Sequence, residues 1–157
     1  MTFTIHKTAG ARIPRQALVR LGHLVARGER IGRGGEVSVI VTTGVVVRRL
    51  NGRYRKKGVT TDVLSFRLLF SHASGFCGEV YIDHRVAARQ ARDHGHSYGA
   101  EITRLTLHGL LHVCGHDHHS PQDSRRMSLL EERYLRSLKL SGLSPGLVRR
   151  GKLKNPL

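Results

Sequence analysis

The sequence predicts one α+β domain. It would hold a small mixed four-stranded sheet and about five helices. Three observations support this. The chain has 157 residues, which suits one domain. Strand-like and helix-like segments follow one another in mixed order. The segment that ends near Cys114 is apolar nearly all round, as buried helices are.

The first half of the chain predicts two strands, each followed by a helix. Residues 2–6 alternate between apolar and polar, which favours a strand. Apolar residues then recur with helical spacing as far as Gly28, with Pro14 suited to the first helical turn. Residues 36–42 are rich in β-branched residues and predict a second strand. Residues 44–55 predict a weaker helix, because its many valines lower helix propensity.

The second half predicts a pair of strands and then three helices. The strands span residues 62–66 and 78–83, separated by a Gly/Ser loop. Asp83 and Ser97 are suited to cap two helices, which would run to about Gly95 and Cys114. The last helix would begin at Ser120 and Pro121. Its inner stripe consists of Met127, Leu130, Tyr134 and Leu138. We place the domain at residues 1–140, followed by a basic, flexible tail of Gly/Pro-rich sequence at 141–157.

The charge balance indicates a polyanionic partner. The chain carries 27 Lys and Arg against 11 Asp and Glu, a formal net charge of +16. Such a field favours nucleic acid, whereas the 5% aromatic content argues against stacking of single-stranded bases as the main contact. No apolar run reaches the length of a membrane span, and the N-terminus lacks a signal-peptide pattern. Two cysteines fit a reducing compartment, so we expect a cytoplasmic protein with no membrane partner.

The segment HGLLHVCGHDH carries three candidate metal ligands. His108 and His112 are four residues apart and share one face of a helix. Gly115 can end that helix in a left-handed turn, which would bring His118 back toward the other two. Three imidazoles with one open position favour Zn²⁺, although Ni²⁺ or another first-row ion also suits this donor set. His116 and His119 flank His118 as alternative third ligands.

The histidine spacing is also that of the metzincin zinc proteases, so the metal site would lie on a central helix and the turn after it, in zincin-like helix geometry. In those enzymes a Glu follows the first His and acts as the general base. Gly109 occupies that position here, and glycine accepts no proton. Because the histidine spacing is present without the glutamate base, the sequence argues against a protease.

Several segments together resemble the YbeY family. HGLLHVCGHDH resembles the family signature HGxLHLxGYDH, and LNGRYRKKGVTTDVLSF resembles LNxxYRxxDxxTDVLSF. GEVYID resembles a family strand, and MSLLEERYL has the spacing of the family's MxxxEExIL helix. The chain departs from the pattern at His116, where Tyr is usual, at Gly58, where Asp is usual, and at Thr60, where Pro is common. The family's arginine falls on Arg55.

The resemblance implies that residues 1–140 form a metal-dependent, single-strand endoribonuclease, a hydrolase of RNA phosphodiester bonds. It would act in 3′-end maturation of small-subunit ribosomal RNA and in ribosome quality control. Its partners would be ribosomal RNA, the small ribosomal subunit and ribosome-associated proteins. His108, His112 and His118 would hold one divalent ion.

Arg55 would be the catalytic residue that binds the scissile phosphate. The neighbouring cations Arg53, Lys56 and Lys57 would contact the RNA backbone. The sequence does not identify the general base. Asp117 either orients an imidazole or acts as the base, and a metal-bound hydroxide alone or the RNA 2′-hydroxyl are the other candidates. The oligomeric state is left open. The alternative functions are a non-catalytic, metal-stabilised ribosomal RNA or ribosome assembly factor and, less favoured, a zinc peptidase.

Overall fold

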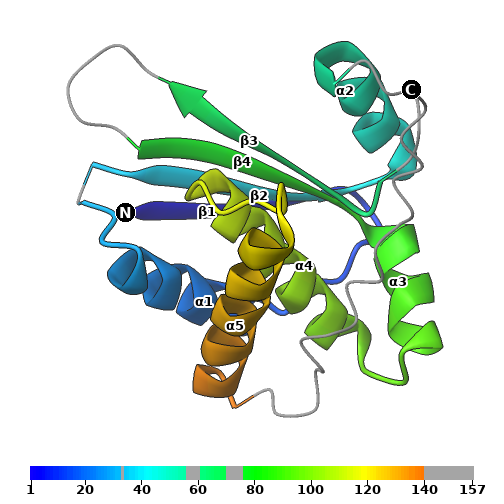
Figure 1. Ribbon diagram of the computed structural model, residues 1–157. Helices are drawn as coiled ribbons and strands as arrows, with labels where there is room; N and C mark the ends of the chain where they lie inside the picture. The colour runs from blue at the N-terminus through cyan, green and yellow to red at the C-terminus, as the bar shows by residue number, and fades with distance from the viewer. Residues whose placement is uncertain (33, 56–60, 70–75, 140–157) are drawn as a thin grey trace.

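The computed structural model describes the chain except residues 33, 56–60, 70–75 and 140–157. Nine elements follow one another in this described part (Figure 1). The strands are β1 (Thr2–Lys7), β2 (Glu36–Thr42), β3 (Val63–Leu69) and β4 (Phe76–Asp83). The helices are α1 (Arg15–Gly28), α2 (Gly44–Arg55), α3 (His84–Asp93), α4 (Tyr98–Val113) and α5 (Pro121–Ser137). The predicted flexible tail lies outside the described residues.

The four strands form one mixed sheet in the order β1-β2-β4-β3. β1 and β4 each pair with β2 in parallel, and β3 pairs with β4 antiparallel. Helix α1 connects the parallel pair β1 and β2, as parallel strands require a crossover. These features confirm the predicted α+β class, mixed sheet and helix number within the described chain.

Element ends show where local sequence determines structure. Asp83, Ser97 and Ser120 cap α3, α4 and α5, and each side chain accepts a hydrogen bond from a backbone N–H in the first turn. Pro14 lies one position before α1 rather than in its first turn. The second strand pair is longer than predicted, because pairing between β3 and β4 extends the ladder from Val63 to Leu69 beyond the apolar pattern.

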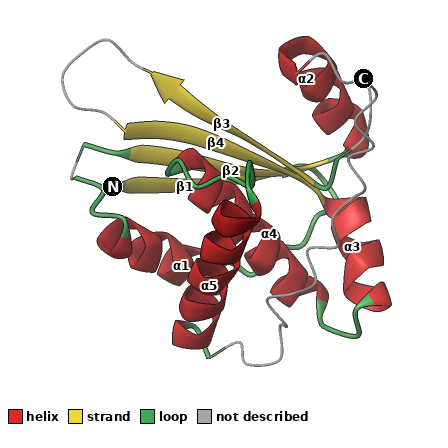
Figure 2. Ribbon diagram, viewed as in Figure 1, coloured by secondary structure: helices red, strands yellow, loops and turns green. Residues whose placement is uncertain are grey.

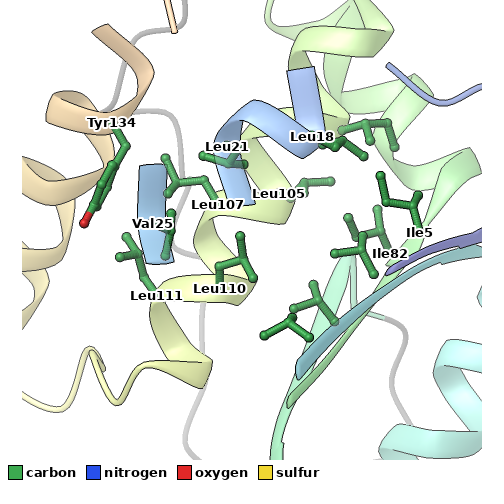
Figure 3. Close-up of a cluster of buried hydrophobic side chains, with 14 of the residues drawn as sticks. Ile5, Leu18, Leu21, Val25, Ile82, Leu105, Leu107, Leu110, Leu111 and Tyr134 are labelled. Atoms are coloured by element: carbon green, nitrogen blue, oxygen red, sulfur yellow. The ribbon is translucent and has the colours of Figure 1, made fainter. Parts of the chain in front are cut away.

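Helix α4 is the buried centre of the domain. Twelve of its residues are buried, as its apolar sequence predicts. Figure 3 shows leucines of α4 beside Leu18, Leu21 and Val25 of α1. Tyr134 of α5 lies next to Val25. The core is close-packed in this region, so α4 provides a rigid support for the side chains at its C-terminal end.

Two glycines allow α4 to lie close against the sheet. A Cβ atom at Gly109 would overlap the side chain of Val80 on β4. A Cβ atom at Gly78 would overlap Val113 at the end of α4. The sequence of this interface therefore fixes the distance between the helix and β4 at the level of the last two helical turns.

Helix α2 lies apart from the layer formed by α1, α4 and α5 (Figure 2). Its Tyr54 ring contacts Phe66 of β3 edge to face, with the ring centroids 5.2 Å apart, and Phe66 in turn contacts Tyr81 of β4. Side chains alternate between the faces of a sheet, so these aromatic residues cover the face opposite Val80. In the described residues no helix is both long and apolar enough to cross a bilayer.

Candidate metal centre

Three imidazoles converge at the C-terminal end of α4. His108 and His112 project from the helix and His118 from the turn that follows it, and one ring nitrogen of each lies within 4.8 Å of the others. The ring centroids are 4.7 to 5.1 Å apart. The side chains grade from buried His108 to exposed His118, so the cluster is closed toward the core and open toward solvent.

A Schellman turn places His118 in this cluster. Gly115 has φ +96°, a left-handed conformation that favours glycine. The N–H of Gly115 donates to the carbonyl of His112 at 2.9 Å, and the N–H of His116 donates to that of Leu111 at 3.0 Å. The helix therefore ends where Gly115 predicts, and the chain turns back beside its own last turn.

The positions of the nitrogens suit a tetrahedral ion. The Nε2 atoms of His108 and His112 lie 3.1 Å apart. Two nitrogen ligands of a tetrahedral zinc site, with bonds of about 2.0–2.1 Å, lie about 3.3 Å apart. A small adjustment of either side chain therefore brings both nitrogens to ligand positions.

Glu131 of α5 fixes the orientation of His108. The Nδ1–H of His108 donates to Oε1 of Glu131 at 2.7 Å, and this carboxylate is only 3% exposed. The hydrogen bond places the proton on Nδ1 and directs the Nε2 lone pair toward His112 and His118. The sequence-based prediction missed Glu131, although it lies on the inner stripe of the last helix, between Met127 and Tyr134.

Asp117 supports the turn rather than standing free beside it. Its Oδ1 accepts the backbone N–H of His118 at 2.8 Å and lies 3.7 Å from Nδ1 of His112, and its Oδ2 lies 2.6 Å from Nε2 of His119. Burial alone would raise the pKa of Asp117, but the His118 hydrogen bond and the nearby histidines outweigh it and lower the pKa. Burial, followed by His108, lowers the pKa of His118 and favours its neutral form.

The alternative third ligands face elsewhere. His116 donates from Nε2 to Oε2 of Glu29 at 2.8 Å, and His119 pairs with Asp117. His118, the preferred third ligand, lies in the cluster, whereas the His116 ring is held by the Glu29 carboxylate. Burial raises the pKa of the Cys114 thiol to about 12, so this thiol is protonated at neutral pH.

Glu29 joins two other elements to the turn. Its Oε1 accepts the O–H of Tyr134 at 2.7 Å while its Oε2 accepts His116. Burial would raise the pKa of Glu29, but the bonds from His116 and Tyr134 outweigh it and lower the pKa. Burial and Glu29 together raise the pKa of Tyr134 to about 12. No short-range sequence signal indicated this cluster, because Glu29 is 87 residues from His116.

The predicted phosphate-binding cations are only partly described. Arg55 is the last residue of α2, and its side chain lies outside the described part, as do Lys56 and Lys57. Arg53 is exposed, and its guanidinium lies over the Tyr54 ring, 5.6 Å from the centroid. Arg67 of β3 was not predicted. Its Nη1 lies 3.6 Å from the position that a Cβ would take at Gly115, so it is a cation beside the turn that carries His118.

Position 109 excludes the base of the zinc proteases on steric grounds as well. A Cβ there would overlap Val80, so the longer side chain of a glutamate has no space between α4 and β4. Close packing of α4 against β4 requires glycine at position 109. The same requirement excludes a glutamate base there.

Comparison with known proteins assigns the family. The profile of the family described as Endoribonuclease YbeY matches residues 6–139. The chain belongs to the YbeY family. It is therefore an endoribonuclease, a hydrolase of RNA phosphodiester bonds, as the resemblance predicted.

Curated relatives and a solved structure agree with this assignment. Endoribonuclease YbeY of Solibacter usitatus is 38% identical over 144 residues, 92% of this chain and 90% of the relative. The enzyme of the same name from Carboxydothermus hydrogenoformans is 42% identical over 109 residues, 69% of this chain and 76% of the relative. The solution structure of TM1509 from Thermotoga maritima has a TM-score of 0.60 at 23% identity, covers 96% of this chain and 99% of its own, and supports the fold.

Proposed function

We propose that this endoribonuclease uses one divalent metal ion, held by His108, His112 and His118, to mature ribosomal RNA. The observation that carries the proposal is the convergence of three imidazole nitrogens on α4 and its turn, with Glu131 orienting the first. In this proposal the endoribonuclease domain is residues 1–140, and the basic segment 141–157 contributes cations that bind RNA.

Zn²⁺ is the ion that this donor set favours, and Ni²⁺ or another first-row ion is compatible with imidazole ligands. When bound, the ion supplies a water of lowered pKa and polarises a phosphoryl oxygen. Three neutral imidazoles contribute no negative charge, so the full charge of the ion acts on the substrate. The exposed His118 side of the cluster is where the RNA strand would approach.

Basic side chains of the chain would bind the phosphate groups of the RNA. We assign the scissile phosphate to Arg55, whose planar guanidinium offers paired donors and offsets charge that develops in the transition state. Arg53, Lys56 and Lys57 contact neighbouring phosphates. Arg67 adds a cation beside Gly115, on the side of the turn that faces β3.

Asp117 is a positioning residue in this proposal rather than the general base. Both of its oxygens are engaged, one by the His118 amide and one by His119. Its lowered pKa also makes it a weak proton acceptor. Glu131 is buried in a hydrogen bond to His108, so it would orient this ligand, and a bound ion would supply the activated water.

The substrate is the precursor of small-subunit ribosomal RNA, cut near its 3′ end in the cytoplasm, with ribosome-associated proteins as partners. The net charge of +16 supports binding to a folded RNA particle through phosphates. The two free cysteines, Cys77 and Cys114, are compatible with a reducing compartment.

The test is cleavage of a precursor RNA by the purified protein, with and without a chelator, beside His112→Ala and Arg55→Ala. We expect cleavage to require metal and both side chains. Zinc binding by Arg55→Ala at wild-type affinity would show that its effect is on the substrate. Unchanged cleavage by a folded His112→Ala protein would favour the assembly-factor alternative instead.

A further inference from the structure

The turn that carries His118 is tied to two distant elements through one carboxylate. Glu29 follows the last residue of α1, His116 lies in the turn after α4, and Tyr134 belongs to α5. The Glu29 carboxylate accepts one hydrogen bond from each, at 2.8 Å from His116 and 2.7 Å from Tyr134. We call Glu29, His116 and Tyr134 the carboxylate anchor.

The anchor is rigid on the side away from the metal centre. Glu29 is the C-cap of α1, and its backbone N–H bonds to the carbonyl of Val25 in the last turn. The Tyr134 hydroxyl lies so close to the backbone of Gly28 that a Cβ there would overlap it. Tyr134 is also 4% exposed and belongs to the main core. Two packed helices therefore hold the carboxylate that His116 contacts.

His118 lies between two fixed points of the chain. On one side His116 is fixed by the anchor and by its backbone bond to Leu111. On the other side Ser120 caps α5. Between them, the amide of His118 bonds to the neighbouring Asp117, which belongs to the same short segment. The position of His118 relative to His108 and His112 thus depends on where His116 is held.

We propose that Glu29 and Tyr134 are positioning residues for the third metal ligand, acting on His118 through His116. This inference rests on the proposed metal centre and extends it to α1, an element that contributes no ligand. The anchor restricts the turn before the ion binds, so less conformational freedom is lost on binding. Its loss lowers metal affinity while His108, His112 and Glu131 keep their geometry.

The experiment measures zinc affinity by competition with a chromophoric chelator for Glu29→Ala, His116→Phe and the double variant. Loss of an outer partner of a metal ligand costs about 10- to 100-fold in affinity, and we expect the lower end because the anchor acts through the backbone. The double variant should bind as weakly as either single one, since both remove the same tether. His116→Tyr, whose hydroxyl can donate to Glu29, should recover most of the affinity.

Two further variants separate positioning from a general effect on the fold. Glu132→Ala removes an exposed ion pair with Arg136 on α5 and should leave affinity unchanged. Tyr134→Phe keeps the ring in the core and removes only the hydroxyl, so it replaces Glu29→Ala if that protein does not fold. Urea unfolding of the metal-free proteins monitors stability separately from affinity.

The outcomes are distinct. Wild-type affinity in Glu29→Ala and His116→Phe, or losses that add in the double variant, would overturn the inference and leave the metal centre intact. Absence of zinc binding in the wild-type chain would overturn the proposed function together with the inference.

Discussion

The two ends of α4 each carry a cluster of side chains that could bind a metal, and they differ in what already occupies the ligand atoms. At the C-terminal end the cluster is His108, His112 and His118. At the N-terminal end it consists of His94 and His96, which precede the helix, and Glu101 in its first turn. In both clusters the candidate atoms lie within 4.8 Å of one another.

At the N-terminal end a fixed cation holds the carboxylate. Both oxygens of Glu101 accept hydrogen bonds from the guanidinium of Arg104, and His96 lies 3.1 Å from Oε2. Glu101 is fully buried and Arg104 is 4% exposed. Nδ1 of His94 has no hydrogen-bond partner among the described residues, but a divalent ion beside it would be repelled by the guanidinium.

At the C-terminal end the carboxylate acts on the far side of the ring. Glu131 binds Nδ1 of His108 and leaves Nε2 directed at the cluster. The comparison teaches that converging ligand atoms are not sufficient for a metal centre. The lone pairs of the ligand atoms must also be available to the ion. Glu131 leaves the Nε2 lone pair of His108 available, whereas Arg104 occupies both oxygens of Glu101.

The largest expected effect is loss of the ion from the C-terminal cluster. His112→Ala removes one of three ligands, and we expect zinc affinity to fall by more than about 100-fold, beyond the range for an outer partner. RNA cleavage should fall with it. Metal content measured by mass spectrometry after dialysis checks the first effect, and a variant that retains one equivalent would contradict the assignment.

The next effect concerns the N-terminal cluster and the fold. Arg104→Leu leaves Glu101 buried without its cation, and breaking a buried pair in this way costs about 3–5 kcal/mol of unfolding free energy. Urea denaturation of the metal-free protein measures the loss. Glu101→Gln/Arg104→Leu, which removes both charges, should recover part of it. If Arg104→Leu lowers the unfolding free energy by less than about 1 kcal/mol, the Glu101–Arg104 pair contributes no more than an exposed ion pair does.

Glu131→Gln removes the charge of the carboxylate that orients His108. An amide can still accept the bond from His108 but carries no charge, so we expect metal affinity to fall by about 10-fold, the lower end of the range for outer partners. The adjacent Glu132→Gln is the matched control, because Glu132 pairs with Arg136 instead. Equal zinc affinities in Glu131→Gln and Glu132→Gln would show that Glu131 does not contribute to metal binding.

The smallest expected effect is that of His94→Ala on metal content. Zinc stoichiometry and affinity should equal those of the wild-type chain, because we assign no ion to the N-terminal cluster. Isothermal titration of the metal-free protein measures both. A lower stoichiometry in this variant would mean that the guanidinium of Arg104 does not prevent binding.

Local features of the structure were predictable from the sequence. Helix caps and the Gly115 turn depend on residues within one helical turn, and His108, His112 and His118 lie on one helix and its turn. By contrast, the placement of β3 at the sheet edge next to β4, with β2 on the other side of β4, depends on long-range packing. Glu131 and Glu29 reach the site from 23 and 87 residues away, where no periodicity links them to their partners.

Zinc titration of metal-free protein, followed by X-ray absorption spectroscopy of the loaded sample, tests whether only the cluster at the C-terminal end of α4 binds a metal ion. We predict one equivalent of zinc, bound by three imidazole nitrogens and one exchangeable oxygen. No bound zinc, or a second tight equivalent held by imidazole and carboxylate, would contradict the distinction drawn between the two ends of α4.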